Sequence, residues 1–236
     1  MPRKVFIGIL FVIGIVFLIL LFWKKPLMQN TDAKIRYVAL GDSYSNGEGE
    51  TSSDAWPVVL TNHLKKEGHD IELVANPSVS GFTTQDLIDR ELPVFIKARP
   101  NFATLLIGAN DLFQDIDKKI LQTNFVTILD KMQEILPDKQ NIVILTIPDY
   151  SVSPQARLYK SNPQEQNKIA EFNEFIKKEA ERRKLSVVDL FDLAKAMGED
   201  DSLVTADGLH PSAKELKLWE EKIYPIADKL FREQIP

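Results

Sequence analysis

The feature that most constrains this chain is a regular alternation of short apolar runs with longer segments of helical spacing. Strand-like runs occur at residues 35–40, 71–75, 103–107, 142–147 and 186–188. Between them apolar residues recur every three or four positions, as from Leu121 to Ile135. Parallel strands need crossover connections, and the helices that make them cover both faces of the sheet. The alternation therefore predicts an α/β domain built on a five-stranded parallel sheet.

One apolar stretch, residues 5–23, is too long for a strand and has basic residues on both sides. At about 1.5 Å per helical residue it would cross a hydrocarbon core of about 30 Å. The apolar region of a cleavable signal peptide is usually shorter, about 7–15 residues, and ends in small residues. This run ends in Phe22-Trp23. We therefore expect one N-terminal transmembrane helix, with a removed signal peptide or a buried soluble helix as the alternatives.

These expectations divide the chain into an anchor at residues 1–25, a polar linker at 26–34 and a domain at 35–236. Basic residues flank the apolar run at both ends, so the positive-inside rule alone does not orient it. We expect a short cytoplasmic amino terminus, a single pass through the cell membrane and an extracytoplasmic domain, because such a tether is most simply an export device.

Charge and cysteine content exclude several classes of function. The chain has a net charge of −5, and removing the four basic residues of 1–25 leaves 25 basic against 34 acidic residues, a net of −9. Such a domain repels nucleic acid and gains nothing from anionic lipid headgroups. The absence of cysteine excludes disulfides, thiolate metal sites and a cysteine nucleophile. Three histidines leave little for a multi-histidine metal centre.

Four polar stretches stand where strands end or helices begin. Parallel strands finish at one edge of a sheet, so these stretches could share a crevice there. They are Gly41-Asp42-Ser43-Tyr44-Ser45, the segment 76–84 with Gly81, Gly108-Ala109-Asn110-Asp111, and Asp207-Gly208-Leu209-His210.

Their residue types fit acyl transfer. A serine hydroxyl such as that of Ser43 is a weak nucleophile and needs an adjacent base, a role suited to histidine. His210 lies in a turn punctuated by Gly and Pro, whereas His63 and His69 fall in a helix and a polar turn and are expected to be solvated. Asp207, three residues before His210, is near enough to orient its imidazole.

Ester cleavage also requires donors for the oxyanion that forms in the tetrahedral intermediate. Asn110 offers a side-chain amide, and the backbone N–H groups of Ser43 and Gly81 can approach a substrate closely. We expect these three groups to form an oxyanion hole.

The four stretches, in this order and spacing, resemble the four motif blocks of the SGNH hydrolases, also called the GDSL lipase/esterase family, over residues 35 to about 231. The resemblance implies a three-layer α/β/α fold of flavodoxin-like character and an ester hydrolase that needs no metal or other cofactor. By the family's pattern Ser43 is the nucleophile, His210 the base and Asp207 its orienting carboxylate. Tyr44 stands where the family's name has leucine, and we expect it to line the pocket wall.

Other interpretations of the first stretch are weaker. A glycine-rich loop after a first strand can bind phosphate, but Glu48 and Glu50 would place carboxylates against it. With Asp42 and Asp54 they could hold a cation, although an exposed acidic turn is the simpler interpretation. Beyond these, a membrane-tethered binding module on the same fold is the alternative from another class, because fold does not fix function. An acyl-thioesterase is the alternative among enzymes.

The segment 148–163 has no clear periodicity and is either a surface excursion or a loop that contacts substrate, with Tyr150 as a candidate contact. The sequence does not define the substrate pocket. The expected location at the cell envelope favours acyl lipids or O-acetyl groups on glycans as the ester substrate.

Overall fold

The computed structural model describes residues 34–159 and 162–233, and contacts within the chain group everything from Lys34 onward into one compact unit. Its five strands form a single parallel sheet in the order β2-β1-β3-β4-β5. The strands are β1 (Ile35–Gly41), β2 (Ile71–Ala75), β3 (Phe102–Leu106), β4 (Ile142–Leu145) and β5 (Ser186–Val188). The predicted α/β fold with a five-stranded parallel sheet is confirmed.

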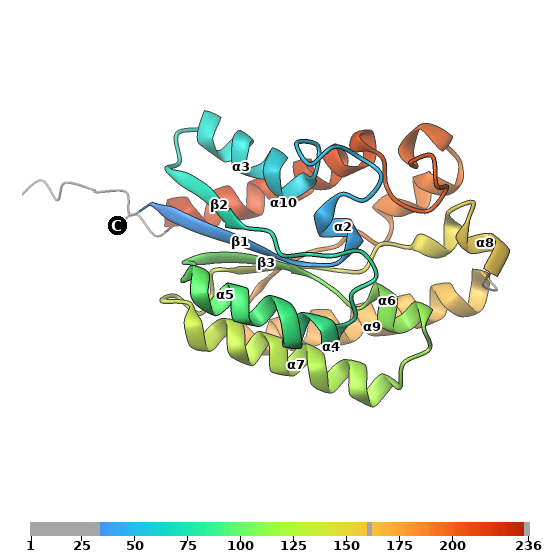
Figure 1. The fold of residues 1–236 in the computed structure, drawn as a ribbon, viewed down its shortest axis with the longest axis horizontal. Coiled ribbons are helices and arrows are strands. Elements are labelled where there is room, and N and C mark those ends of the chain that lie inside the picture. The colour runs from blue at the N-terminus through green and yellow to red at the C-terminus, as the bar shows by residue number, and fades with distance from the viewer. Residues whose placement is uncertain (1–33, 160–161, 234–236) are drawn as a thin grey trace, which may run out of the picture. The chain divides into compact units, whose positions relative to one another are not determined.

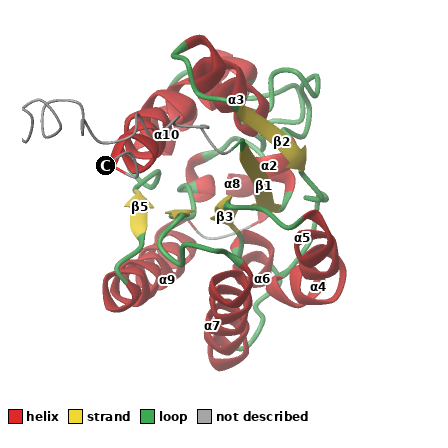
Figure 2. Ribbon diagram, turned by 90° about the vertical axis from the view of Figure 1, so that its left-hand side faces the viewer, coloured by secondary structure: helices red, strands yellow, loops and turns green. Residues whose placement is uncertain are grey.

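Helices connect the strands and cover both faces of the sheet (Figures 1 and 2). In both views α3 and α10 lie on one face, and α5, α7 and α9 lie on the other. The α-helices of the described residues are α2 (Ser43–Asn46), α3 (Trp56–Lys66), α4 (Thr84–Asp86), α5 (Leu92–Ala98), α6 (Ala109–Phe113), α7 (Lys118–Ile135), α8 (Ala156–Tyr159), α9 (Asn162–Arg183) and α10 (Ala213–Glu233). Shorter turns are η1 (Leu87–Glu91), a π-helix, and the 3₁₀ turns η2 (Tyr150–Val152), η3 (Leu193–Gly198) and η4 (Asp201–Leu203).

The core forms where these layers meet. All residues of β3 and β4 are buried, as expected for parallel strands that are covered on both sides. On one face Trp56 and Leu60 of α3 and Trp219 and Ile223 of α10 are fully buried. Burying such side chains is worth roughly 1.5–3 kcal/mol each, so the helices are held mainly by their apolar faces.

The strand order puts a topological switch at β1, which lies between β2 and β3. In open sheets of this order, ligands bind outside the carboxyl ends of the strands at the switch point. Ser43 follows β1 and Asn110 follows β3. Two of the predicted site residues therefore stand on either side of that crevice.

Some strand boundaries differ from the prediction. β4 ends at Leu145 instead of Ile147, because the side chain of Asn173 in α9 bonds both backbone groups of Ile147, at 2.8 Å each. β3 lies one residue earlier than predicted, at Phe102–Leu106, and β1 extends one residue further, to Gly41, which pairs with Leu106.

The segment 148–163 is not a featureless excursion. It contains η2 and α8, and Tyr150 to Ser153 are buried. The amide of Gln155 donates to the carbonyl of Gly208 at 2.9 Å. This segment therefore packs against the turn that carries His210.

His63 and His69 are less solvated than predicted. Nδ1 of His63 lies 2.8 Å from Glu220, and its ring stacks on Tyr224 with centroids 3.8 Å apart. The side chain of His69 is 11 % exposed and bonds Asp228 at 2.7 Å. His63 of α3 and His69, which follows α3, both bond carboxylates of α10. Neither belongs to the group of residues around His210.

The predicted membrane anchor at 1–25 and most of the linker at 26–34 lie outside the residues that the structure describes. Within residues 34–159 and 162–233, no helix combines the length and the apolar character needed to span a bilayer.

Candidate active site

Ser43 sits in a tight strand-to-helix turn. A Cβ on Gly41 would lie 2.4 Å from the carbonyl oxygen of Leu106 and 2.4 Å from Oγ of Ser45, so only glycine fits at the end of β1. Asp42 then caps α2, its Oδ1 accepting the amide of Tyr44 at 3.1 Å. Ser43 is the first residue of α2 and is 6 % exposed. The turn fixes its backbone at the carboxyl edge of the sheet.

Asp207 and His210 form a hydrogen-bonded pair. Nδ1 of His210 donates to Oδ2 of Asp207 at 2.6 Å, while its backbone amide donates to Oδ1 at 3.0 Å. Oδ1 also accepts the amide of Leu209 and the hydroxyl of Thr205, both at 2.7 Å. Because Nδ1 carries the proton in this pair, Nε2 of the neutral ring is an acceptor. The arrangement supplies an oriented base.

The same hydrogen bonds decide the charge of Asp207. Partial burial acts to raise the pKa of its carboxyl, but the bonds from His210, Thr205 and Leu209 outweigh burial and hold that pKa well below its usual range. Asp207 therefore stays ionised as a partner for the imidazole.

Tyr44 lies beside His210. Tyr44 is 5 % exposed, and the centroid of its ring lies 6.1 Å from that of the imidazole and 5.7 Å from that of Trp219. Burial, followed by the charges of Asp42 and other carboxylates, raises the pKa of the Tyr44 hydroxyl well above its usual value. Since Tyr44 follows Ser43 directly, this packing also brings Ser43 and His210 into one region of the fold.

The candidate oxyanion donors are joined through Phe82. Nδ2 of Asn110 donates one proton to the carbonyl of Phe82 at 2.9 Å, which leaves its second N–H for another acceptor. Gly81, which directly precedes Phe82, has φ of +83°, and a Cβ there would meet nothing within 4 Å. The amide of Gly81 therefore belongs to an open, left-handed turn beside Asn110.

Hydrogen bonds also join the first stretch to the segment 76–84. Nδ2 of Asn76 donates to the carbonyl of Ser45 at 2.8 Å, and Ser80 bonds Glu48.

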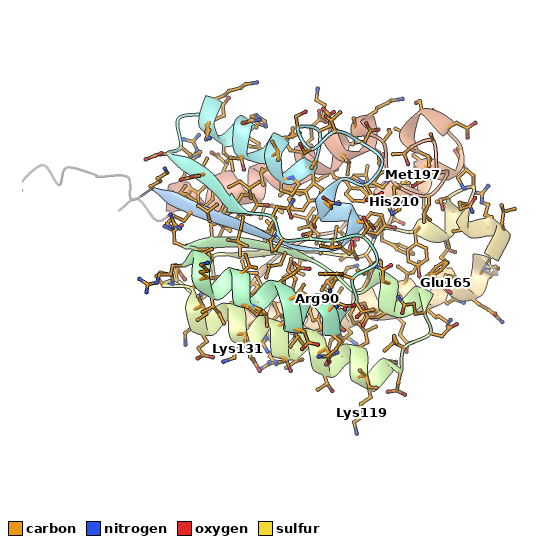
Figure 3. All side chains as sticks on the ribbon, in the orientation of Figure 1. Arg90, Lys119, Lys131, Glu165, Met197 and His210 are labelled. Atoms are coloured by element: carbon orange, nitrogen blue, oxygen red, sulfur yellow. The ribbon has the colours of Figure 1, made fainter. Side chains whose placement is uncertain are left out.

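Further contacts complete the connections among the four polar stretches. The amide and hydroxyl of Thr84 bond Asp111 at 2.8 and 2.5 Å. The ring of Tyr44 in the first stretch lies 6.1 Å from that of His210 in the last, and just beyond these stretches the amide of Ala213 donates to Glu50 at 2.9 Å. All four stretches therefore meet at one edge of the sheet. Figure 3 shows His210 and Glu165 at this end of the domain, away from Lys131.

Tyr150 is placed differently from a typical substrate contact. It is 3 % exposed, and its hydroxyl donates to Glu165 at 2.5 Å. Its ring lies 6.3 Å from that of Phe113. Any contact of Tyr150 with a substrate would thus involve the ring and not the hydroxyl.

The carboxylates weighed as a cation site have separate partners. Glu48 bonds Ser80, Glu50 bonds the amide of Ala213, Asp54 bonds Thr51, and Asp42 caps α2. In the part of the chain that the structure describes, no three acidic or histidine side chains gather in a way that could hold a metal ion.

Sequence reasoning missed Thr205, which donates to Asp207. The signal was present as a hydroxyl residue two positions before the aspartate, a spacing typical of local side-chain turns. Sequence reasoning also missed Glu91, which is fully buried in η1. Acidic residues are seldom fully buried, so its position is unusual.

Comparison with known proteins settles the family. The family model described as GDSL-like Lipase/Acylhydrolase matches residues 39–214. The chain belongs to this family. It is therefore a carboxylic ester hydrolase, and its five-stranded parallel sheet matches the GDSL fold.

One relative is similar to this chain in sequence, and two solved structures are similar to it in fold. An arylesterase of Vibrio mimicus is 26% identical over 185 residues, which cover 77% of this chain and 82% of the relative. A lipase/acylhydrolase from Enterococcus faecalis has a solved structure with a TM-score of 0.66 at 21% identity, covering 81% and 94% of the two chains. A family 3 carbohydrate esterase from Clostridium thermocellum gives a TM-score of 0.67 at 18% identity, covering 86% and 99%.

Proposed function

We propose that this GDSL hydrolase cleaves esters through an acyl-enzyme on Ser43, with His210 as base and Asp207 as the carboxylate that orients it. The observation that carries the proposal is the pair of hydrogen bonds that His210 donates to Asp207, from Nδ1 at 2.6 Å and from the backbone amide at 3.0 Å. This pairing keeps the proton on Nδ1 and leaves Nε2 to take the proton of the serine hydroxyl.

The chemistry follows from these roles. Oγ of Ser43 attacks the ester carbonyl as its proton passes to Nε2 of His210, and the resulting imidazolium is stabilised by Asp207. The oxyanion accepts hydrogen bonds from the amides of Ser43 and Gly81 and from the free N–H of Asn110. The imidazolium then protonates the leaving alcohol. Water, activated by the same imidazole, releases the acid from Ser43.

The test uses the full-length chain in detergent. A fluorophosphonate should label the wild type at Ser43, and p-nitrophenyl esters should be hydrolysed. Ser43→Ala should abolish both reactions, while Ser53→Ala, which changes an exposed serine of the following loop, should leave both unchanged. A folded wild-type chain that neither labels nor turns over would contradict the proposal and favour a binding module.

For the substrate, apolar side chains beside the candidate site support an acyl chain longer than acetate. Val79, next to the oxyanion turn, is 45 % exposed, Phe113 of α6 is 37 % exposed and Leu158 of α8 is 75 % exposed. These residues belong to three segments that adjoin the candidate site, and exposed apolar side chains near a site are typical of surfaces that bind apolar ligands. We therefore favour lipid acyl esters over O-acetyl glycans.

A series of p-nitrophenyl esters from acetate to dodecanoate, with an acyl-thioester of matched length, separates these substrates. We expect kcat/KM to rise with chain length. Phe113→Ser should reduce that rise and leave acetate hydrolysis nearly unchanged. A wild-type optimum at acetate would instead indicate O-acetyl groups, and a preference for the thioester would indicate a thioesterase.

We also propose that residues 1–25 tether the enzyme to the cell membrane, with the hydrolase domain on the extracytoplasmic side. The support is the uninterrupted apolar run at residues 5–23. The full-length protein should stay with the membrane fraction after an alkaline carbonate wash, and protease added to intact cells should remove the domain. A soluble protein whose amino terminus starts after residue 23 would show a cleaved signal peptide.

A further inference from the structure

Glu91 is a buried acid that the proposed reaction does not use. It ends η1 within the continuous helix α4–η1–α5, and its side chain is fully buried. Oε2 accepts the amide of Gly41 at 3.0 Å. Oε1 has no hydrogen-bond partner among the residues that the structure describes. Burying a carboxyl is costly, so its retention here calls for a physical reason.

The amide of Gly41 needs an acceptor from outside the sheet. β2 ends at Ala75, which pairs with Val38, so the last residues of β1 run beyond their neighbour on that side. An unpaired backbone amide in the interior costs about as much as a lost hydrogen bond. Glu91 supplies the acceptor that β2 no longer provides.

A displacement at this amide would reach the nucleophile. Gly41 is two residues before Ser43 and is confined between β3 and α2, with no space for even a Cβ. Asp42, between them, fixes the amide of Tyr44. The segment is short and tightly packed, so it moves as a unit and a shift of Gly41 displaces Ser43.

The other end of the same helix contacts the oxyanion side of the site. Thr84 bonds Asp111, the neighbour of Asn110, through both its amide and its hydroxyl. The π-turn η1 then adds a wider turn, and Glu91 and Leu92 are both buried. The helix α4–η1–α5 therefore connects the oxyanion donors with the strand that carries the nucleophile.

The electrostatics of this pocket suit a neutral acid. Burial raises the pKa of Glu91 to about 8, the bond from Gly41 opposes this, and the charges of Asp42 and Asp86 add to it. At neutral pH the carboxyl is therefore largely protonated and needs no positive partner. It can accept from Gly41 as a neutral amide would.

We propose that Glu91 is a positioning residue for ester hydrolysis: through the amide of Gly41 it holds the turn of Ser43 in register with the oxyanion donors. This inference rests on the proposed function. Its contribution is geometric, and it acts on catalysis through Ser43 and not by contact with substrate.

The test compares variants of the full-length chain. Glu91→Gln keeps an acceptor for Gly41 and should keep kcat within about twofold. Glu91→Leu and Glu91→Met remove the acceptor and keep a side chain of similar volume. We expect the nucleophile to be misplaced in both, which should lower kcat by about 10–100-fold with KM nearly unchanged. Leu92→Ala is the matched control, because it removes a buried side chain of the same helix without touching Gly41. Its kcat should stay near that of the wild type while it is folded.

Two outcomes would overturn the inference: wild-type kcat in a folded Glu91→Leu or Glu91→Met variant, or an equal loss in Leu92→Ala. A second measurement does not depend on ester hydrolysis. With glycine labelled by ¹⁵N, the amide of Gly41 should exchange with solvent faster in the Leu and Met variants than in wild type, and unchanged in Glu91→Gln. A wild type that hydrolyses no ester would contradict the proposed function but not the contact between Glu91 and Gly41. Equal exchange rates of the Gly41 amide in all variants would contradict the inference about Glu91.

Discussion

At Asp207 hydrogen bonds from four groups converge on one carboxylate, and two of them come from His210. The amide of Leu209 and the hydroxyl of Thr205 fix Oδ1, so Oδ2 is presented to the imidazole in one orientation. These bonds also hold the pKa of the Asp207 carboxyl well below its usual range, against the effect of burial. The pair can therefore work as an oriented base without a separate event to ionise the carboxylate.

Asp207→Asn should reveal this role. An amide cannot stabilise the imidazolium and favours the wrong tautomer, so we expect kcat to fall by about 10⁴-fold, as in a Ser-His-Asp triad, with KM little changed. Steady-state kinetics on a p-nitrophenyl ester measure the effect. Asp201→Asn, an exposed aspartate six residues earlier, serves as the control. A loss of less than tenfold in Asp207→Asn would argue against the assignment.

The proposed oxyanion role of Asn110 can be tested against the structural effect of losing a nearby hydrogen bond. Asn110→Ala removes an oxyanion donor, which typically costs about 10²–10³-fold in kcat, and also removes the donor to the carbonyl of Phe82. Asn124→Ala, which removes a bond to Thr84 in the neighbouring helix, should change kcat by less than about threefold. Similar losses in both variants would mean that the effect is structural.

Single residues also show where sequence reasoning reached its limit. The types and spacing of Ser43, Asn110, Asp207 and His210 were enough to predict that they would gather at one edge, because parallel strands end together. His69 could not be placed in the same way. Its partner Asp228 lies 159 positions away, and only the packing of the α3 side against α10 brings the two together.

At the scale of elements, the turn after β1 and the turn before α4 use glycine for different reasons. Gly41 is extended but enclosed, whereas Gly81 is left-handed and open. Gly81→Ala should lower the free energy of unfolding by about 1–2 kcal/mol, because alanine is strained in the left-handed conformation. Gly41→Ala places a Cβ 2.4 Å from a backbone oxygen and should cost about 3 kcal/mol or more. Urea denaturation of the two variants measures both, and equal losses would contradict the packing at Gly41.

The ends of the elements were predicted less well than their presence. Apolar runs marked all five strands, but the end of β4 depends on a side chain of α9 that replaces a strand partner at Ile147. The π-turn at Leu87–Glu91 leaves no periodic signal in so short a helix. Local pattern fixes where a strand can form, and long-range hydrogen bonds decide where it stops.

For the whole molecule, the alternation of apolar runs with helical segments predicted a parallel sheet with helices on both faces. Such an arrangement buries both faces of the apolar strands. The order β2-β1-β3-β4-β5 did not follow from the runs themselves, since right-handed crossovers permit several orders. It was the resemblance to a family that supplied a flavodoxin-like expectation. The order matters for function because it places the switch point at β1 and brings Ser43 and Asn110 to the same crevice.

The buried carboxyls give the domain an unusual dependence of stability on pH. Burial is the largest cause that raises the pKa of Glu91 to about 8 and of Asp42 to about 7, both far above their values in an unfolded chain. The folded state therefore binds more protons than the unfolded state between about pH 4 and pH 8. The stability that these protons confer is complete below about pH 4 and is lost as pH rises through 7 and 8.

Carboxyls with lowered pKa values, such as those of Asp207 and Asp228, act in the opposite sense. Their contribution is present above about pH 4 and disappears as the solution becomes more acidic. The carboxyls with raised pKa values and those with lowered ones together predict that the domain is most stable near pH 4–5. There Glu91 and Asp42 still hold their protons, while Asp207 and Asp228 are ionised. Between pH 5 and 8 the free energy of unfolding should fall, by at most about 1.4 kcal/mol per pH unit for each group.

Thermal unfolding of the full-length chain at pH 4.5, 6, 7.5 and 9 measures this dependence. Wild-type Tm should be highest at pH 4.5 and fall at each higher pH up to about 8, and the Tm of Glu91→Gln should fall less, because a neutral amide has no proton to lose. The two proteins should therefore differ most at pH 9 and least at pH 4.5. The control Asp201→Asn, which changes an exposed surface residue, should leave the slope unchanged. A wild-type Tm that rises steadily from pH 5 to 9 would mean that Glu91 is ionised in the folded state, and a buried counter-charge would then have to be found for it.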